Sequence, residues 1–270
     1  MKKVMFGLAA AAAIAAFGIE SANTVGYTAK EVTAGKFYLI GTQFDAAGTA
    51  SAGSIDMNDL IKLSSTIEAG LYDDDFATAP QIQVLNAAGN GYNMYFYISD
   101  GTYDDGDDTP LGFDAWCDEN GYELTAEAKL ALGKGFWFKS PVTSGSITTA
   151  GQVSEVASTT LNFPANKFTI LCNPYPVAVA LQSLTTSATP GLYDDDFATA
   201  PQIQVLNASA VGYDMYFYIS DGTYDDGDDT PLGFNAWCDE NGYELEGTQI
   251  DAGAAFWITA PVAGSVTFSL

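Results

Sequence analysis

An internal repeat is the feature that most restricts how this chain of 270 residues can fold. Residues 70–124 and 191–245 align without a gap and differ at only five positions, which are 88, 89, 90, 93 and 114 in the first copy. Weaker matches flank this block in the same order: "AGKFYLIGTQF" (34–44) faces "ANKFTILCNPY" (165–175), and "GKGFWFKSPV" (133–142) faces "GAAFWITAPV" (253–262). The order predicts two tandem homologous modules of ordinary domain size, at residues 23–152 and 161–270, joined by a linker at residues 153–160.

Within each copy the local patterns are those of β-strands. Short apolar or alternating runs bounded by glycine, asparagine or proline are typical of strands, and aromatic and β-branched residues favour them. Such runs include "KFYLIG", "QIQVLN", "GYNMYFYIS", "GFWFKS" and "SVTFSL". They predict an all-β protein made of two antiparallel β-sandwich or small-barrel modules. One short helix is expected in the first module, over residues 54–65, with Asp56 as its N-cap.

The N-terminal segment "MKKVMFGLAAAAAIAAFG" has two lysines followed by an apolar run over residues 4–17. This run is shorter than the roughly 20 residues that span a bilayer, so we interpret residues 1–22 as a secretory signal peptide rather than a membrane anchor. The predicted mature chain is therefore extracytoplasmic (secreted, on the cell surface or in the periplasm) and has no transmembrane segment.

The charge balance and two missing residue types exclude several functions. The chain has 34 acidic and 9 basic residues, all nine of them lysines, and its net charge is −25. This charge repels nucleic acid and anionic lipid. Without histidine there is no Ser-His-Asp triad and no imidazole ligand for zinc, and without arginine there is no bidentate clamp for phosphate. We therefore predict that the protein is not an enzyme; the catalytic alternative left open is a hydrolase that works with a pair of carboxylates.

The repeated stretch "YISDGTYDDGDDTPLGF" carries five aspartates in nine residues, and further acidic clusters precede it at residues 73–75 and 194–196. Adjacent carboxylates about 5 Å apart repel by about 0.8 kcal/mol in water, so the loop needs either full hydration or a cation. Calcium binds six to eight oxygens in irregular loops and is the expected cofactor. The alternative is a hydrated turn that keeps the protein soluble. The candidate metal ligands are Asp100, Asp104, Asp105, Asp107, Asp108, Asp221, Asp225, Asp226, Asp228 and Asp229.

The repeated motif "AWCDENGYEL" contains the candidate ligand-stacking residues Trp116, Tyr122, Trp237 and Tyr243. Aromatic rings beside acidic and amide groups are suited to stacking on sugars, but strand aromatics more commonly belong to the core. The same motif contains Cys117 and Cys238, and Cys172 is the third cysteine. An odd number leaves at least one thiol unpaired or paired between chains. The two repeated cysteines could meet only if a two-fold axis brought the repeats together, so three buried free thiols that pack as small apolar groups are favoured.

Three segments together resemble a large, mostly uncharacterised group of secreted proteins of Verrucomicrobia, Lentisphaerae and related bacteria. These segments are "NTVGYTAKEVTAGKFYLIG" after the export signal, the "PQIQVLN…YNMYFYIS" block, and "GKGFWFKSP". The resemblance covers nearly the whole chain and implies export and a β-module fold. It implies no activity, because its motifs are turn glycines and strand aromatics.

These observations predict a secreted structural or surface-associated protein with Asp-rich loops that are candidates for calcium binding. Its expected partners are other surface proteins or further copies of itself. The alternative is a pair of carbohydrate-binding modules, for which two weak glycan sites would give avidity. A carboxylate-based hydrolase is the third function class.

Overall fold

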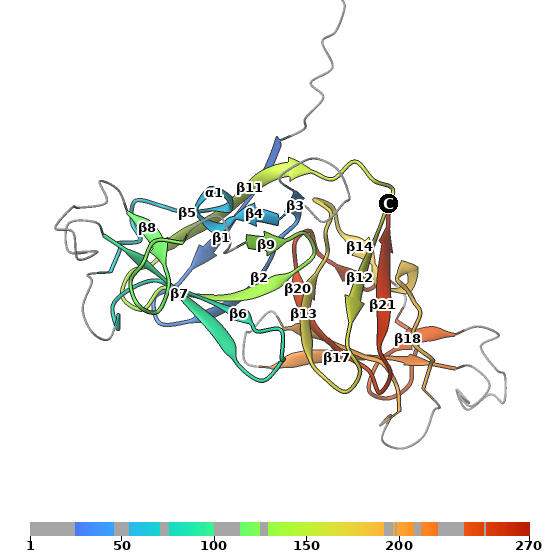
Figure 1. Ribbon diagram of the computed structural model, residues 1–270. Helices are drawn as coiled ribbons and strands as arrows, with labels where there is room; N and C mark the ends of the chain where they lie inside the picture. Colours follow the sequence, from blue (N-terminus) through green and yellow to red (C-terminus); the bar gives the residue numbers. More distant parts are fainter. Residues whose placement is uncertain are drawn as a thin grey trace, which may run out of the picture.

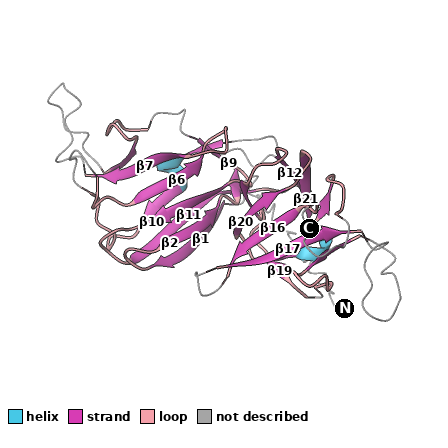
Figure 2. Cartoon of the chain, turned by 90° about the horizontal axis from the view of Figure 1, so that it is seen from below, coloured by secondary structure: helices cyan, strands magenta, loops and turns pink. Residues whose placement is uncertain are grey.

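The computed structural model describes residues 25–45, 54–70, 76–99, 114–124, 129–191, 197, 199–207, 212–220, 235–245 and 247–270. Within these ranges the chain forms short strands in several small sheets, together with one four-residue helix and one 3-10 turn (Figure 2). Every pairing between named strands is antiparallel. The all-β prediction is confirmed.

The N-terminal half, residues 25–153, contains a five-stranded sheet in the order β2-β10-β6-β7-β8. A second sheet pairs β11 with β1, β3 and β5, and β4 pairs with β9 in a two-stranded ribbon. The strands of this half are β1 (Val25–Val32), β2 (Phe37–Gly41), β3 (Phe44–Asp45), β4 (Ser54–Asp56), β5 (Ile61–Leu63), β6 (Gln81–Leu85), β7 (Tyr92–Ile98), β8 (Ala115–Cys117), β9 (Lys129–Ala131), β10 (Gly135–Lys139) and β11 (Gly145–Val153).

The C-terminal half, residues 158–270, repeats this pairing scheme. Its five-stranded sheet has the order β13-β20-β16-β17-β18, a three-stranded sheet has the order β12-β21-β15, and β14 pairs with β19. The strands are β12 (Ser158–Phe163), β13 (Thr169–Cys172), β14 (Val179–Ala180), β15 (Thr185–Thr186), β16 (Gln202–Leu206), β17 (Tyr213–Ile219), β18 (Ala236–Cys238), β19 (Gln249–Ile250), β20 (Ala255–Thr259) and β21 (Gly264–Ser269). Residues 154–157, inside the predicted linker, connect β11 to β12.

Side-chain alternation explains why each half has its own core. Along β12, Leu161 and Phe163 are buried while their neighbours face outward. In β10, Phe136 and Phe138 point into the core of the N-terminal half, and Trp137 lies on the opposite face of the sheet. Successive side chains of a strand point to opposite faces, so one sheet can cover two apolar layers. A large apolar cluster fills each half between its sheets.

The predicted helix over residues 54–65 is mostly wrong. Only α1 (Met57–Leu60) is helical, and it lies between β4 and β5. Ile61 continues as a strand because it is buried and pairs with Thr149 of β11. Tertiary pairing thus limits the helix to one turn, and the C-terminal half has the 3-10 turn η1 (Leu181–Ser183) in the corresponding place between β14 and β15.

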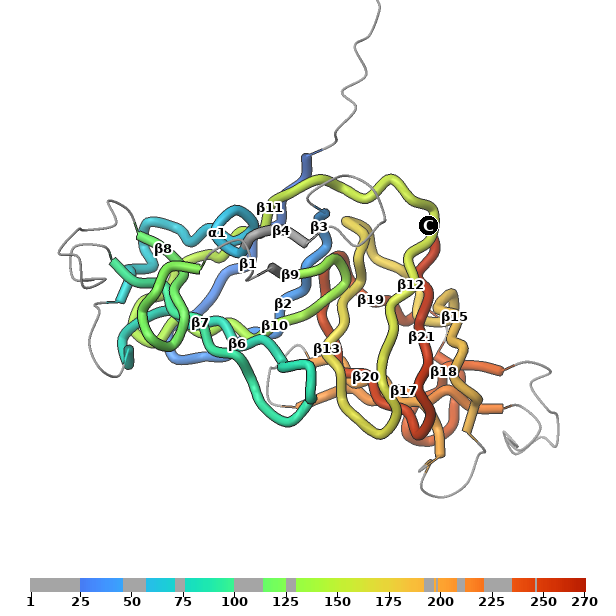
Figure 3. The backbone as a smooth tube through the Cα atoms, viewed as in Figure 1, coloured from blue at the N-terminus to red at the C-terminus, as the bar shows by residue number. Residues whose placement is uncertain are grey.

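The two halves lie side by side and touch through their five-stranded sheets. Figure 3 shows β13 and β20 beside β2 and β10 at the centre of the molecule. The strands β8 and β18 lie at opposite ends (Figure 1), so the two copies of the repeat extend away from each other. None of the helices in the described ranges is both long and apolar enough to span a bilayer.

Candidate functional site

The ten candidate metal ligands lie outside the described residues, as do the acidic clusters at 73–75 and 194–196. Their points of attachment are described: residues 100–113 connect β7 to β8, and residues 221–234 connect β17 to β18. Within the described ranges, no group of three or more Asp, Glu or Cys side chains is arranged to hold a metal ion. The calcium site therefore stays a prediction.

The two tryptophans of the predicted stacking set are in the core. Trp116 is 0% exposed and Trp237 is 1% exposed, and each packs against a tyrosine of the adjacent strand, Tyr97 or Tyr218, with ring centroids 5.2 Å apart. Stacking requires an open ring face, so the interpretation of both tryptophans as sugar platforms is wrong. They close the apolar space between sheets, which is the commoner role of a strand tryptophan.

The two tyrosines of the same set are on the surface. Tyr122 and Tyr243 are each 57% exposed. Each sits in a turn closed by an aspartate: Asp118 Oδ1 accepts the Tyr122 N–H at 3.0 Å, and Asp239 does the same for Tyr243. Because these turns are fixed by their own hydrogen bonds, each copy presents one tyrosine in the same way. A role in ligand stacking remains a prediction for Tyr122 and Tyr243.

All three cysteines are buried and free, as the sequence predicted. Burial raises the pKa of Cys117, Cys172 and Cys238 to about 12. For Cys117, the carboxylates of Glu123 and Asp118 contribute a smaller part of this same rise in pKa. A thiol reacts as the thiolate, so none of the three is a nucleophile near neutral pH.

The contact between the halves is built from equivalent positions of the repeat. Gly41 aligns with Cys172, and Gly133 aligns with Gly253. The Gly41 N–H donates to the Gly253 carbonyl at 3.1 Å, and the Cys172 N–H donates to the Gly133 carbonyl at 2.9 Å. The two hydrogen bonds are equivalent: exchanging the two halves of the chain turns one bond into the other. The junction is therefore a pseudo-two-fold contact within one chain.

Apolar side chains and one glycine hold this junction closed. Leu39 of β2 packs with Ile170 and Cys172 of β13 and Ala255 of β20, with Trp137 and Trp257 at the margin. A Cβ on Gly41 would overlap the Cβ of Cys172, so only glycine allows the two strands to come this close. We call the contact of β2 and β10 with β13 and β20 the junction.

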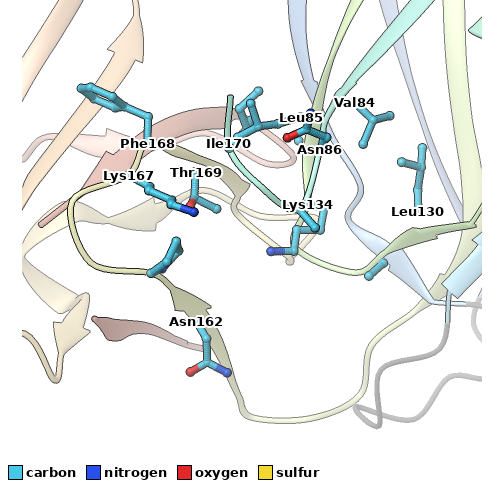
Figure 4. Close-up of a pocket in the computed structure, with 15 residues that line it drawn as sticks. Val84, Leu85, Asn86, Leu130, Lys134, Asn162, Lys167, Phe168, Thr169 and Ile170 are labelled. Carbon is cyan, nitrogen blue, oxygen red and sulfur yellow. The ribbon is translucent and has the colours of Figure 1, made fainter. Parts of the chain in front are cut away.

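A pocket of about 400 Å³ opens at one side of the junction, and we call it the junction pocket. The N-terminal half contributes the β6–β7 turn and the segment from β9 into β10, and the C-terminal half contributes β12, β13 and their connecting turn. Figure 4 shows Lys134 and Lys167 facing the space between the two halves. Burial lowers the pKa of Lys134, while the neighbouring Cys172 opposes the shift.

Sequence reasoning missed this pocket. One signal was present: lysine is rare in this chain, and "GKGFWF" of the first copy has lysine where "GAAFWI" of the second has alanine. The pocket forms only where the two halves come together, and local sequence patterns do not reveal which parts of the halves are in contact. In comparisons with known proteins, no family model, no curated protein and no solved structure matches the chain.

Proposed function

We propose that this protein is an extracytoplasmic structural protein that joins partners through its two acidic ends. The placement of β8 and β18 at opposite ends of the molecule supports this proposal most directly (Figure 1). The acidic segments connect β7 to β8 and β17 to β18, so they depart from opposite ends of one body. A body of this kind has two equivalent attachment points and can link copies of itself, or other surface proteins, into larger assemblies. The role is non-enzymatic.

The junction supports the same proposal. Two copies of a repeat on a flexible linker would present their ends in variable directions. The paired hydrogen bonds at Gly41 and Cys172 and the apolar contacts around Leu39 instead oppose rotation of one half against the other. A fixed orientation matters for assembly, because contacts that repeat at a constant angle generate regular rings or filaments.

Calcium is the proposed bridging cofactor. Each acidic segment brings five carboxylates into nine residues, and two such segments from neighbouring molecules would repel strongly without a counter-ion. A divalent ion with six to eight oxygen ligands can share carboxylates from both. The ligands in this proposal are the ten aspartates named from the sequence.

The module architecture, the secretion and the relatives of this chain belong to the same proposal. We propose that each half is one β-sandwich or small-barrel module, because the two halves have the same order of strands in their five-stranded sheets and each contains a large apolar cluster. Secretion after removal of residues 1–22, and kinship with the secreted proteins that the sequence resembles, belong to the same proposal.

Carbohydrate binding is the second candidate. The observation in its favour is the equal 57% exposure of Tyr122 and Tyr243 on matching turns. Two weak sites at a fixed spacing would suit a polymeric glycan. A glycan array with the Tyr122→Ala/Tyr243→Ala double variant tests it; binding that survives the double substitution would leave the two tyrosines without a role.

Sedimentation velocity with single-end variants tests the structural proposal. The five aspartates at 100, 104, 105, 107 and 108 are changed to asparagine in one variant, their copies at 221, 225, 226, 228 and 229 in a second, and all ten in a third. With millimolar calcium we expect species larger than dimers for the native chain, dimers for each single-end variant and monomers for the third, with reversal by EDTA.

The matched control changes five exposed carboxylates elsewhere to glutamine, namely Glu31, Glu68, Glu119, Glu155 and Glu240. It should assemble like the native chain. The proposal fails if calcium leaves the native sedimentation unchanged, or if a single-end variant still forms species larger than dimers.

A further inference from the structure

The junction pocket gathers positive charge in a chain whose net charge is −25. Lys134 enters it from the residue before β10, and Lys167 enters from the turn between β12 and β13. Both side chains are directed into the space between the halves (Figure 4). None of the described residues that line the pocket is acidic. The pocket thus has an electrostatic character opposite to that of the chain as a whole.

Lys134 is held in a desolvated position. Its side chain is only partly accessible, and burial is the main cause that lowers its pKa. No carboxylate of the described residues contributes to the electrostatics of this ammonium group. A partly buried cation without a counter-charge is unfavourable, and a bound anion would offset that cost.

Lys167 is positioned by the opposite half. Its aliphatic stem runs along the β6–β7 turn, where a Cβ on Gly89 would lie 3.4 Å from Lys167 Cδ. This contact brings an exposed lysine of the C-terminal half over a pocket that the N-terminal half also builds. The ammonium groups of Lys134 and Lys167 therefore face the same pocket only because the two halves are in contact at the junction.

Neutral polar groups complete the lining. Asn86 Oδ1 accepts the Asn90 N–H at 3.3 Å, which leaves the Asn86 Nδ2 group as a donor. Asn162 and Thr169 also line the pocket, and Leu130 and Ile170 supply apolar surface. A few polar groups around an apolar wall, in a volume of this size, are typical of small-molecule sites.

The other side of the junction lacks this chemistry. A cavity of about 280 Å³ there is lined by Lys30 and by the carboxyl-bearing Asp251. The Lys30 Nζ donates to the Leu39 carbonyl at 3.4 Å and lies 5.7 Å from the Tyr38 ring centroid. Lys30 therefore already has partners within the chain, and the acidic residue Asp251 in the same lining disfavours an anion.

We propose that the junction pocket binds a small organic monocarboxylate with a hydroxylated body, such as a uronic acid unit. The carboxylate would lie between the ammonium groups of Lys134 and Lys167. The hydroxyl groups would bond to Asn86, Asn162 and Thr169, and the apolar face of the ring would lie on Ile170. A single negative charge fits best, because the overall charge of −25 makes each further charge costly to bring in.

Isothermal titration calorimetry of the purified protein with glucuronate tests the proposal, with glucose as the neutral analogue and sulfate as the inorganic dianion. We expect saturable binding of glucuronate with a dissociation constant on the order of 1 mM, and at least tenfold weaker binding of glucose and sulfate. Lys134→Met should weaken glucuronate binding by about tenfold or more, and Lys167→Met by about threefold to tenfold.

Lys36→Met is the matched control, because Lys36 occupies the position in the first copy that Lys167 occupies in the second. It should change the affinity less than twofold. Should Lys134→Met not fold, Lys167→Glu on the exposed side of the pocket tests the same charge and should abolish binding. The proposal is overturned if glucuronate does not bind up to about 50 mM, if glucose binds equally well, or if neither lysine affects affinity.

Discussion

The two halves of this protein share a nearly identical block of 55 residues (70–124 and 191–245). The strands on either side of this block differ in sequence between the halves. The shared block forms β6, β7 and β8 in one half and β16, β17 and β18 in the other, with the same register. The strands that meet at the junction belong to the divergent part, where glycine at 41 faces cysteine at 172. When the two halves of a repeat contact each other about a pseudo-two-fold axis, equivalent positions face each other. Two bulky residues could not both fit at positions 41 and 172.

The equivalent tryptophans Trp116 and Trp237 differ in their hydrogen bonding. The Trp237 Nε1–H donates to the Leu184 carbonyl at 3.2 Å. The equivalent Trp116 Nε1 is buried and has no hydrogen-bond partner among the described residues. The cause lies outside the shared block, since α1 stands in the N-terminal half where η1 stands in the C-terminal half. Identical residues therefore do not imply identical energetics.

The largest effect is expected from filling the space at the junction. Gly41→Cys should lower the free energy of unfolding by about 3 kcal/mol, because its Cβ overlaps that of Cys172. The double variant Gly41→Cys/Cys172→Gly exchanges the two residues across the pseudo-two-fold and should recover at least half of the loss. Urea unfolding of both variants measures this. Equal destabilisation of the single and double variants would mean that the two positions are not coupled.

The buried thiols predict a loss of stability at alkaline pH. Their pKa is raised from 9.0 to about 12 by folding, so the folded state holds the protons that the unfolded state releases between these values. The stabilisation is complete below pH 9 and is lost as the pH rises to about 12. From pH 9 to pH 10 each thiol should remove about 1 kcal/mol.

The cysteine-free variant, with alanine at 117, 172 and 238, isolates this effect in urea unfolding at both pH values. The two proteins differ only at these three positions, so the difference in slope belongs to the thiols, together with the interaction between Cys172 and Lys134 that the variant also removes. A variant that loses as much stability as the native chain over this interval would contradict the assignment.

Substitution of the two repeated tryptophans compares the halves directly. Trp116→Phe and Trp237→Phe remove the same volume, but only Trp237→Phe leaves the Leu184 carbonyl without its donor. We expect Trp237→Phe to cost about 1–2 kcal/mol more than Trp116→Phe. Urea unfolding measures the difference, and each variant is the control for the other. Equal costs would mean that the two indoles are equally well satisfied.

The smallest effect is a gain of stability at Gln43. Its side chain is fully buried beside Gly253, and neither Oε1 nor Nε2 has a hydrogen-bond partner in the part of the chain that the structure describes. Gln43→Met keeps the volume and should raise the free energy of unfolding by about 1 kcal/mol. Gln83→Met is the control, because Gln83 Nε2 already donates to Gln81 at 2.9 Å. A loss of stability in Gln43→Met would indicate that an ordered water satisfies the amide.

Several strands could be predicted from sequence because their signal is local. The runs "GFWFKS" and "GYNMYFYIS" correspond to β10 (Gly135–Lys139) and β7 (Tyr92–Ile98). The helix over 54–65 was predicted too long because pairing of Ile61 with β11 overrides local propensity. The sequence around Trp116 and Trp237 is ambiguous, because polar neighbours in sequence do not reveal burial between sheets. The junction pocket could not be predicted, since it requires residues 134 and 167, which lie between strands of different halves, to line one space.

The contacts at the junction should join the two halves into one cooperative body. Differential scanning calorimetry tests it through the ratio of the calorimetric to the van't Hoff enthalpy of unfolding. One cooperative body predicts a single transition with a ratio near one. Two resolved transitions, or a single one with a ratio near two, would show that the halves unfold independently and would contradict the account.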